Sequence, residues 1–413
     1  MTSFDDLYKL AVDAAVHDDI DALTALPDYD THSLDCLLNP RAYPPVIRLG
    51  PCNCDEGKCT SVCFYKAITH DKDGNIEISD QDCVGCGDCI IACDAHNLTE
   101  IKEVVPIFEM INSAVPVYAL IAPAYLSQFG PDMTPGRLRS AFKQLGFAGL
   151  IEVALFADIL TLKEALEFDA AVTREEDFVL TSCCCPMWIG MIEKVYSRLV
   201  PHMPPSVSPM VASGRAVKVL HPEAKTVFIG PCIAKKAESR QKDIADAVDY
   251  VLTFKEMADI FDAAGVDPKK LEEDLRDHSS AAGRIYARTG GVSEAVAATV
   301  ERIAPDRKLP LKAKQGNGVP ECKALLKAIM EGAADANFLE GMGCVGGCVG
   351  GPRALIDRKE GAKNVDAYAG LAANKTPVDN PFVLDMLQRL GFDSTESLLK
   401  PGNIFTRNFD NHD

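Results

Sequence analysis

The sequence predicts an α/β protein in which a small module organised by cysteines precedes a larger domain of two βαβ-type lobes. Two observations predict this arrangement. The chain has 16 cysteines, and eight of them lie between Cys52 and Cys93. After Leu98, short apolar runs alternate with stretches of helical periodicity, a pattern typical of parallel sheets covered by helices.

The apolar pattern divides the chain into three expected parts: a helical segment over 1–45, the cysteine module over 46–100 and the larger domain over 101–413. Ser3 is a candidate N-cap for the first helix. No internal repeat is expected. Buried strands are predicted at 115–122, 177–181, 226–230 and 250–254, and helices at 136–145, 187–200, 210–220 and 255–264.

Charge and hydropathy exclude several classes of partner. The 42 basic and 60 acidic residues give a net charge of −18, which argues against nucleic acid and anionic membranes. The longest apolar stretch, 114–126, is too short to span a bilayer, and the acidic N-terminus is unlike a signal peptide. We therefore expect a cytoplasmic protein, in which clustered cysteines indicate metal and not disulfides.

Four cysteines of the module have the spacing C-x2-C-x2-C-x3-C: Cys83, Cys86, Cys89 and Cys93. In this pattern three thiolates bind one 4Fe-4S cube and the fourth cysteine binds a second cluster. A structural zinc site is the alternative, but such sites use two separated C-x2-C pairs. The spacing favours iron–sulfur clusters.

The other four cysteines of the module are spaced irregularly, as C-x-C-x4-C-x3-C: Cys52, Cys54, Cys59 and Cys63. The end of this run is similar to a bacterial ferredoxin motif, although Phe64 stands where proline is usual. The crossed pattern of two-cluster ferredoxins predicts one 4Fe-4S cluster on Cys52, Cys54, Cys59 and Cys93, and another on Cys83, Cys86, Cys89 and Cys63. The module is thus expected to be a bacterial ferredoxin-like domain with two clusters.

Three later segments also carry cysteines: 181–188 (TSCCCPMW), 230–238 (GPCIAKKAE) and 338–352 (FLEGMGCVGGCVGGP). The first two follow predicted strands, and sites in open α/β sheets form where strands end. Cys344 and Cys348 form C-x3-C in a glycine-rich loop, which lets backbone amides approach a cluster closely. Cys185 and Cys232 would complete a set of four ligands.

These segments, in this order behind the cysteine module, resemble the signature segments of iron-only (FeFe-type) hydrogenases from about Cys52 to Pro352. The resemblance implies an H-cluster, which is a 4Fe-4S cube joined through one cysteine sulfur to a two-iron unit with CO, cyanide and a bridging azadithiolate. It also implies that Cys185, Cys232, Cys344 and Cys348 bind the cube, and that Cys348 is the shared bridge.

The same resemblance implies roles for other side chains. Lys235 would donate a hydrogen bond to a cyanide, Cys184 would relay protons, and Met342 would lie beside the two-iron unit. Glu164 and Glu167 would belong to a proton path. The alternatives are that Lys235 is a surface lysine and that the glutamates lie on an exposed helix.

The chain departs from the family pattern at several positions. Cys183 stands where serine is expected, Gly230 where methionine is expected, Ala171 where the outer arginine of the proton path is expected, and Ser293 where methionine is usual. The serine of that path falls on a proline near 204–206 by an ungapped count. These departures predict a divergent subgroup marked by the TSCCCPMW motif.

The implied activity is the reversible reduction of protons to H2, with electrons relayed through both ferredoxin-type clusters to or from a carrier such as ferredoxin. Separate maturation proteins would supply the two-iron unit. The alternatives are a hydrogen sensor, which usually carries a signalling domain, and a non-catalytic iron–sulfur relative. Retention of Cys184, Lys235 and Met342 favours the enzyme.

Overall fold

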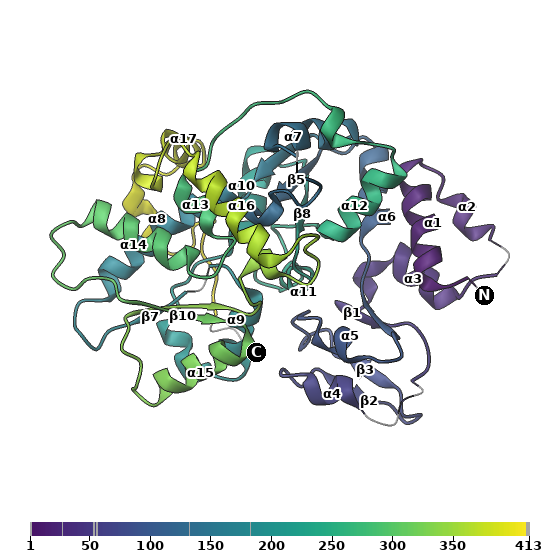
Figure 1. Ribbon diagram of the computed structural model, residues 1–413, viewed down its shortest axis with the longest axis horizontal. Helices are drawn as coiled ribbons and strands as arrows, with labels where there is room; N and C mark the ends of the chain where they lie inside the picture. The colour runs from purple at the N-terminus through teal and green to yellow at the C-terminus, as the bar shows by residue number, and fades with distance from the viewer. Residues whose placement is uncertain are drawn as a thin grey trace.

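A computed structural model describes residues 2–26, 28–52, 54, 57–131, 133–181 and 183–409 of the chain. Ser182 of the first cysteine segment lies outside these residues. The larger domain contains two separate parallel sheets, and the predicted α/β class is confirmed. Figure 1 shows the cysteine module below the first sheet and beside the second.

The first sheet has four parallel strands in the order β6-β5-β8-β9. Their bounds are Val117–Ile121 for β5, Gly149–Glu152 for β6, Lys225–Gly230 for β8 and Tyr250–Thr253 for β9. The central strands β5 and β8 are almost entirely buried, as expected for a parallel sheet covered by helices on both faces. The strands predicted from apolar runs at 115–122, 226–230 and 250–254 are confirmed.

The second sheet has three parallel strands in the order β10-β11-β7. Strand β11 (Phe338–Met342) lies between β10 (Ala313–Asn317) and the short β7 (Val179–Leu180). The register pairs Phe338 with Val179 and Leu339 with Leu180. As a result, the chain leaves β7 and β11 at the same edge of the sheet.

The cysteine module is built from two similar halves, contrary to the expectation of no internal repeat. Helices α4 (Lys58–Val62) and α5 (Asp88–Ala92) each follow a left-handed glycine and end at a cysteine, Cys63 or Cys93. The antiparallel pairs β1–β4 (Val46–Arg48, Leu98–Glu100) and β2–β3 (Ile68–His70, Ile76–Ile78) complete the module.

The N-terminal segment is helical, as predicted, with α1 (Phe4–Val16), α2 (Asp21–Thr24), α3 (Thr31–Leu38) and the 3-10 helix η1 (Pro40–Ala42). Ser3 is the N-cap of α1, and its side chain accepts a hydrogen bond from the Asp6 backbone N–H. Helix α1 packs against α6 (Val104–Asn112) and α12 (Phe254–Ala263), at the upper right of Figure 1.

The remaining helices cover the two sheets. They are α7 (Pro135–Gln144), α8 (Ala154–Ala171), α9 (Pro186–Lys194), α10 (Pro209–Leu220), α11 (Ala234–Glu238), α13 (Ala281–Ile285), α14 (Gly291–Ile303), α15 (Val319–Met330), α16 (Arg358–Gly370) and α17 (Pro381–Arg389). The 3-10 helices are η2 (Pro123–Tyr125), η3 (Ser197–His202), η4 (Pro268–Lys270), η5 (Cys348–Gly350), η6 (Pro377–Asp379) and η7 (Thr395–Leu399).

The helix predicted over 187–200 is wrong in its second half, because α9 ends at Lys194 and the chain continues as η3. The α-helix ends before Val195, and the 3-10 helix that follows contains Pro201, which lacks an N–H and disfavours the α conformation at Val200. The other three predicted helices differ from the observed ones by at most one residue at each end.

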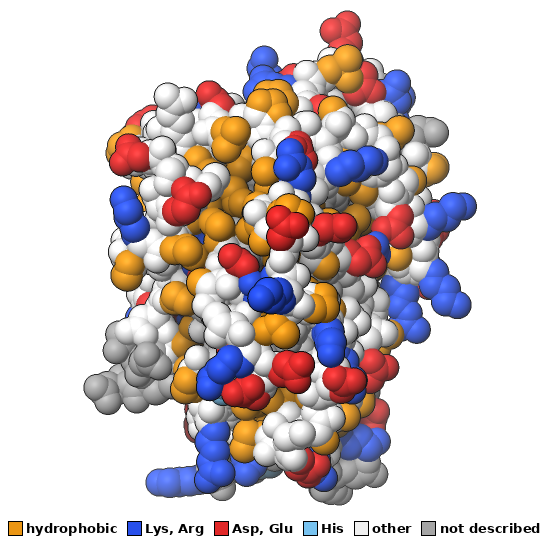
Figure 2. All heavy atoms as spheres, turned by 90° about the vertical axis from the view of Figure 1, so that its left-hand side faces the viewer, with side chains coloured by type: hydrophobic (Ala, Val, Ile, Leu, Met, Phe, Trp, Pro, Cys, Tyr) orange, Lys and Arg blue, Asp and Glu red, His pale blue; other side chains and the backbone are white. Residues whose placement is uncertain are grey.

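The face in Figure 2 carries basic and acidic side chains interspersed with apolar ones, so the net charge of −18 does not collect there in a single acidic patch. Within the described residues, no helix combines the length and apolar character needed to cross a membrane.

Helix α8 connects the elements around it, since it packs against α10, α13, α14 and α17. Its fully buried Asp158 is the centre of one such connection. The carboxylate accepts hydrogen bonds from the backbone N–H groups of Ser280 (2.6 Å) and Gly283 (2.8 Å), and from the Asn380 side chain (3.3 Å). Asp158 thereby fixes the start of α13 and of α17 against α8.

Replacing Asp158 by asparagine is expected to destabilise the protein by about 2 kcal/mol, because the new NH2 group must face donors and leaves buried polar groups unpaired. Calorimetry should show a lower midpoint of thermal unfolding. Asp13→Asn, at a side chain that is 66% exposed, is the control and should leave the midpoint unchanged. An unchanged midpoint for Asp158→Asn would show that these hydrogen bonds are not needed.

Candidate active site

Three parallel strands deliver the three cysteine-bearing segments to one place. Cys183–Cys185 follow β7, Cys232 follows β8 and Cys344 follows β11. Cys185 is the N-cap of α9, and its sulfur accepts a hydrogen bond from the Gly343 N–H (3.2 Å). Backbone N–H groups of this kind stabilise a thiolate, so this corner of the fold suits a cysteine-bound metal.

Four thiols converge there: Cys185, Cys232, Cys344 and Cys348, the buried cysteine group. Burial raises the pKa of Cys344 well above its usual value, and the neighbouring thiols of Cys232, Cys185 and Cys348 raise it further. Burial likewise raises the pKa of Cys185 to about 12. Thiolates that lie close together in a water-free interior need a cationic centre among them. A metal provides this charge, and its binding displaces the thiol protons.

The loop that carries Cys344 and Cys348 depends on its glycines at two positions. Gly347 has a φ of 83°, and a Cβ there would lie 2.7 Å from the Thr289 backbone nitrogen. At Gly350 a Cβ would lie 2.0 Å from the Val345 carbonyl oxygen. Only glycine allows the chain to fold back this tightly, which brings the two thiols of C-x3-C to the same side.

Lys235 lies beside the buried cysteine group, so the surface alternative is wrong. The side chain is 9% exposed, and Nζ donates to the Cys184 carbonyl oxygen (3.2 Å) and forms an ion pair with Glu238. Burial lowers the pKa of Lys235, but Glu238 and the thiols of Cys232 and Cys348 raise it above its ordinary value. A buried ammonium next to four thiols suits an anionic iron–sulfur group.

Met342 ends β11 and is fully buried. Its carbonyl oxygen accepts hydrogen bonds from the Gly318 N–H (2.7 Å) and the Cys322 thiol (3.4 Å). Cys322 is thus held inside the fold and is a candidate structural thiol, the commoner role of an isolated buried cysteine. Ser293, at the start of α14, also has a local partner. Its hydroxyl donates to the buried Glu340 of β11 (2.7 Å).

A chain of buried polar groups leads away from Cys184, and sequence reasoning missed part of it. Burial is the main cause that raises the pKa of the Cys183 thiol, and Cys184 and Glu164 raise it further. The Cys183 thiol therefore lies beside both side chains. Its sulfur is also 4.0 Å from the Tyr286 hydroxyl, which is 2.9 Å from that of Thr161. The extra cysteine of the first motif therefore lies between Cys184 and Glu164.

The second glutamate, Glu167, lies one helical turn further along α8. Its carboxylate accepts a hydrogen bond from the Ser206 hydroxyl (3.0 Å) and forms an ion pair with Lys163. The ungapped count, which placed a proline near 204–206 here, does not match the structure, because the hydroxyl beside Glu167 comes from Ser206. The exposed-helix alternative is also wrong, since Glu164 is 2% exposed and α8 is packed on several sides.

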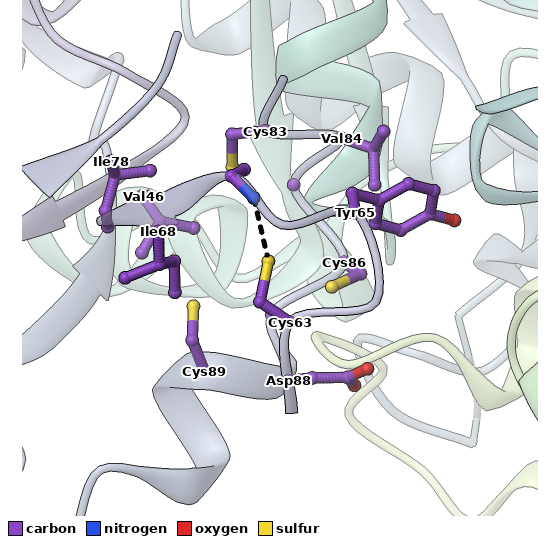
Figure 3. A pocket seen from close by; sticks show the side chains of 13 residues that line it. Val46, Cys63, Tyr65, Ile68, Ile78, Cys83, Val84, Cys86, Asp88 and Cys89 are labelled. Carbon is purple, nitrogen blue, oxygen red and sulfur yellow. Dashed lines mark hydrogen bonds between the residues drawn. The ribbon is translucent and has the colours of Figure 1, made fainter. Parts of the chain in front are cut away.

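The cysteine module brings together Cys63, Cys83, Cys86 and Cys89, the inner module group. These residues line one pocket, and Figure 3 shows their sulfur atoms turned toward a common space. Burial raises the pKa of Cys89 to about 12, with further contributions from Cys83, Cys63 and Cys59. The Ala67 N–H donates to the Cys63 sulfur (3.3 Å), the dashed line in Figure 3.

The outer module group consists of Cys52, Cys54, Cys59 and Cys93. Local desolvation and the neighbouring thiols of Cys52, Cys59 and Cys93 raise the pKa of the exposed Cys54, which places these four thiols near one another. The Asn97 N–H donates to the Cys93 sulfur (3.4 Å), matching the bond at Cys63 in the other half. These are the two groups that the crossed pattern names, and which cysteines share a cluster stays a prediction. Across the described residues, no three His, Cys, Asp or Glu side chains are arranged to hold a single metal ion.

The inner module group packs directly on the buried cysteine group. A Cβ at Gly85 would lie 3.1 Å from the Ala234 Cα, just after Cys232, and the Tyr65 hydroxyl donates to the Met187 carbonyl oxygen (2.8 Å). Arg353, which follows the third segment, donates to the fully buried Glu100 of β4 (2.9 Å). The three cysteine groups are therefore arranged in series.

Comparison with known proteins identifies the family. The family model described as "Iron only hydrogenase large subunit, C-terminal domain" matches residues 115–352. This chain belongs to that family. Membership makes it a metal-binding iron–sulfur protein, and the match contains all four members of the buried cysteine group.

Relatives fall into two functional classes. Iron hydrogenase 1 of Clostridium pasteurianum is 29% identical over 282 residues, which are 59% of this chain and 49% of that protein. The periplasmic [Fe] hydrogenase large subunit of Nitratidesulfovibrio vulgaris is 29% identical over 53% of this chain and 62% of its own length. The chain thus spans about half to three fifths of these hydrogenases.

The second class is named for cluster assembly. Cytosolic iron-sulfur assembly component 3 of Pongo abelii is 24% identical over 377 residues, which are 75% of this chain and 79% of that protein.

Among solved structures, the [FeFe]-hydrogenase of Chlamydomonas reinhardtii is 21% identical, with a TM-score of 0.56 over 68% of this chain and 92% of the other. This likeness shows the shared fold.

The grouping of module cysteines is testable by counting iron in anaerobically reconstituted protein. Cys54→Ala and Cys93→Ala are each expected to lose about four iron atoms per chain, and the double variant no more, because both would serve one cube. Cys54→Ala combined with Cys63→Ala should lose about eight.

Cys36→Ala serves as the control, since Cys36 is a buried thiol outside the three groups, and its iron content should equal that of the unmodified protein. Equal losses of about eight from both double variants would refute the crossed grouping.

Proposed function

We propose that this protein is an FeFe hydrogenase of a divergent subgroup marked by the TSCCCPMW motif, and that it catalyses 2H⁺ + 2e⁻ ⇌ H2. The observation that carries the proposal is the buried ammonium of Lys235 beside four converging thiols, with Cys184 next to it. A 4Fe-4S cube alone needs only the thiols. The ammonium and the second thiol suit a larger anionic group that exchanges protons.

The residues present fit an H-cluster. Cys185, Cys232, Cys344 and Cys348 would hold its cube, with Cys348 as the bridge to the two-iron unit, and Met342 would pack beside that unit. When bound, the H-cluster supplies the iron chemistry of hydrogen formation and cleavage. Lys235 can donate a hydrogen bond to a cyanide while Glu238 holds its ammonium in place, and the buried walls of the site exclude water.

Electrons would pass through the two groups of the cysteine module. The inner module group is packed on the active site and would hold one 4Fe-4S cluster; the outer module group would hold the other. Cys54 is exposed, so an external carrier such as ferredoxin can approach the outer cluster. In this assignment residues 1–45 are a helical support, 46–100 the electron-transfer domain and 101–413 the catalytic domain.

Protons would move along the polar groups at α8. Cys184 exchanges a proton with the active site, and Glu164 lies on the far side of Cys183 as the first buried carboxylate. Glu167 and Ser206 continue toward the surface. Maturation proteins would be needed to supply the two-iron unit.

A second candidate function is cluster assembly without catalysis. It is favoured by the extent of the match, because this chain spans 79% of the assembly component but 49% of the Clostridium hydrogenase. Such a protein would hold cubes but no two-iron unit, and Lys235 and Cys184 would have no ligand to serve.

Infrared spectroscopy of anaerobically matured protein separates the two functions. We expect bands from iron-bound CO and cyanide, together with H2 formation from a reduced viologen dye. Protein matured without the two-iron unit is the control and should show neither. Full cube content with no such bands after maturation would exclude the hydrogenase and favour the assembly protein; bands without appreciable turnover would point to a sensor.

Glu164→Gln is expected to lower the rate of H2 formation by about 10²- to 10⁴-fold, because an amide cannot relay a proton. The infrared bands should be retained, which shows that the cofactor is still bound. Glu109→Gln, on the exposed face of α6, is the control for the loss of one carboxylate. A rate equal to that of the unmodified protein would remove Glu164 from the path.

A further inference from the structure

Lys163, Glu167 and Ser206 form a closed outer triad in which each side chain contacts the other two. The Lys163 ammonium pairs with Glu167 and donates to the Ser206 hydroxyl (2.8 Å), and that hydroxyl donates to Glu167 (3.0 Å). The Lys163 and Ser206 side chains are buried, whereas Glu167 is 10% exposed. The carboxylate therefore lies at the boundary between the interior and solvent.

A lysine with 1% of its side chain exposed is costly unless its charge is compensated, so its position needs a reason. The pair with Glu167 has i,i+4 spacing on α8, which fixes both side chains on one face of the helix. Ser206 comes from the loop before α10, so the triad also joins two elements.

Lys163 is the only charged group that acts on Glu167 among the described residues. Burial raises the pKa of Glu167 above its ordinary value, and Lys163 and the Ser206 hydroxyl offset only part of that rise. Cations on the surrounding elements are engaged elsewhere: Arg215 with Asp246, Arg284 with Asp277, Arg302 with Asp379, Arg307 with Asp169 and Arg407 with Asp243. Glu294, Glu301, Asp385, Arg389 and Glu396 have no resolved effect on it.

The position at which an outer arginine was expected offers no cation. Ala171 is the last residue of α8, and the nearby Arg307 binds the Asp169 carboxylate and the Val172 carbonyl oxygen. If Lys163 were absent, the Glu167 carboxylate would be a largely buried acid without a counter-charge.

We propose that Lys163 is a positioning residue that keeps Glu167 able to lose its proton at neutral pH, and so replaces from inside α8 the cation missing at position 171. This inference rests on the proposed function for its role in turnover. The protonation state of the Glu167 carboxylate does not depend on that function. An adjacent positive charge favours the ionised carboxylate, so removal of Lys163 must raise the pKa of Glu167.

The test is a pH titration of the Glu167 carboxyl by infrared difference spectroscopy on protein loaded with its 4Fe-4S cubes. The carbonyl band of the protonated acid is assigned by its loss in Glu167→Gln. Lys163→Met should shift this titration upward by at least one pH unit. Ser206→Ala removes one hydrogen bond but no charge, so it should give a smaller upward shift.

Two controls separate charge from folding. Lys163→Arg keeps the cation and should restore a titration close to that of the unmodified protein. Lys255→Met removes the lysine of an exposed i,i+4 pair with Asp259 and should change nothing. In matured enzyme, Lys163→Met should also move the acid limb of the H2-oxidation profile to higher pH, because Glu167 must release its proton in each turnover.

An unchanged Glu167 titration in Lys163→Met would overturn the inference. A Lys163→Arg titration shifted as far as that of Lys163→Met would overturn it as well. If Lys163→Met does not fold, the comparison of Ser206→Ala and Lys163→Arg with the unmodified protein still decides it. Absence of CO and cyanide bands would refute the hydrogenase but leave the carboxyl titration as a valid measure of the triad.

Discussion

The fold depends on four thiols held in a dry interior at the ends of parallel strands. Neither the glycine loop nor the strand ends alone create this site; it exists because β7, β8 and β11 finish at neighbouring points of two different sheets. Burial keeps such thiols protonated, so a metal cluster must supply the positive charge that allows them to ionise. A cluster bound there would join the two lobes chemically as well as by packing.

Much of this arrangement could be predicted from the sequence because it obeys local rules. Cysteine spacing defined the two predicted module groups, and apolar runs predicted the strands whose ends carry Cys185 and Cys232. The internal repeat was missed because Cys52 and Cys54 break the spacing that Cys83 and Cys86 keep. The two halves are alike instead in backbone conformation, with left-handed Gly57 and Gly87 at equivalent points.

Other features follow from three-dimensional contacts that no local pattern reports. Tyr286 and Thr161 are far apart in sequence and meet beside Cys183 only when α13 packs on α8. Ser206 was missed because the ungapped count fell on a neighbouring proline, and only the folded chain brings the Ser206 hydroxyl to Glu167. Lys163 had no pattern that marked it, since a lysine followed four residues later by glutamate usually lies on a solvated surface.

The close fit of the module on the larger domain also constrains how electrons can travel. Gly85 leaves little room for a side chain against Ala234, Tyr65 is hydrogen-bonded across the contact, and the buried Glu100 forms an ion pair with the partly exposed Arg353. In the proposed function, an electron-transfer domain attached in this way would not be a swinging arm that visits the site and departs. Its inner cluster would stay at one distance from the active site, so protein geometry would set the rate of the internal electron transfer, and the slow step would be the encounter with the external carrier.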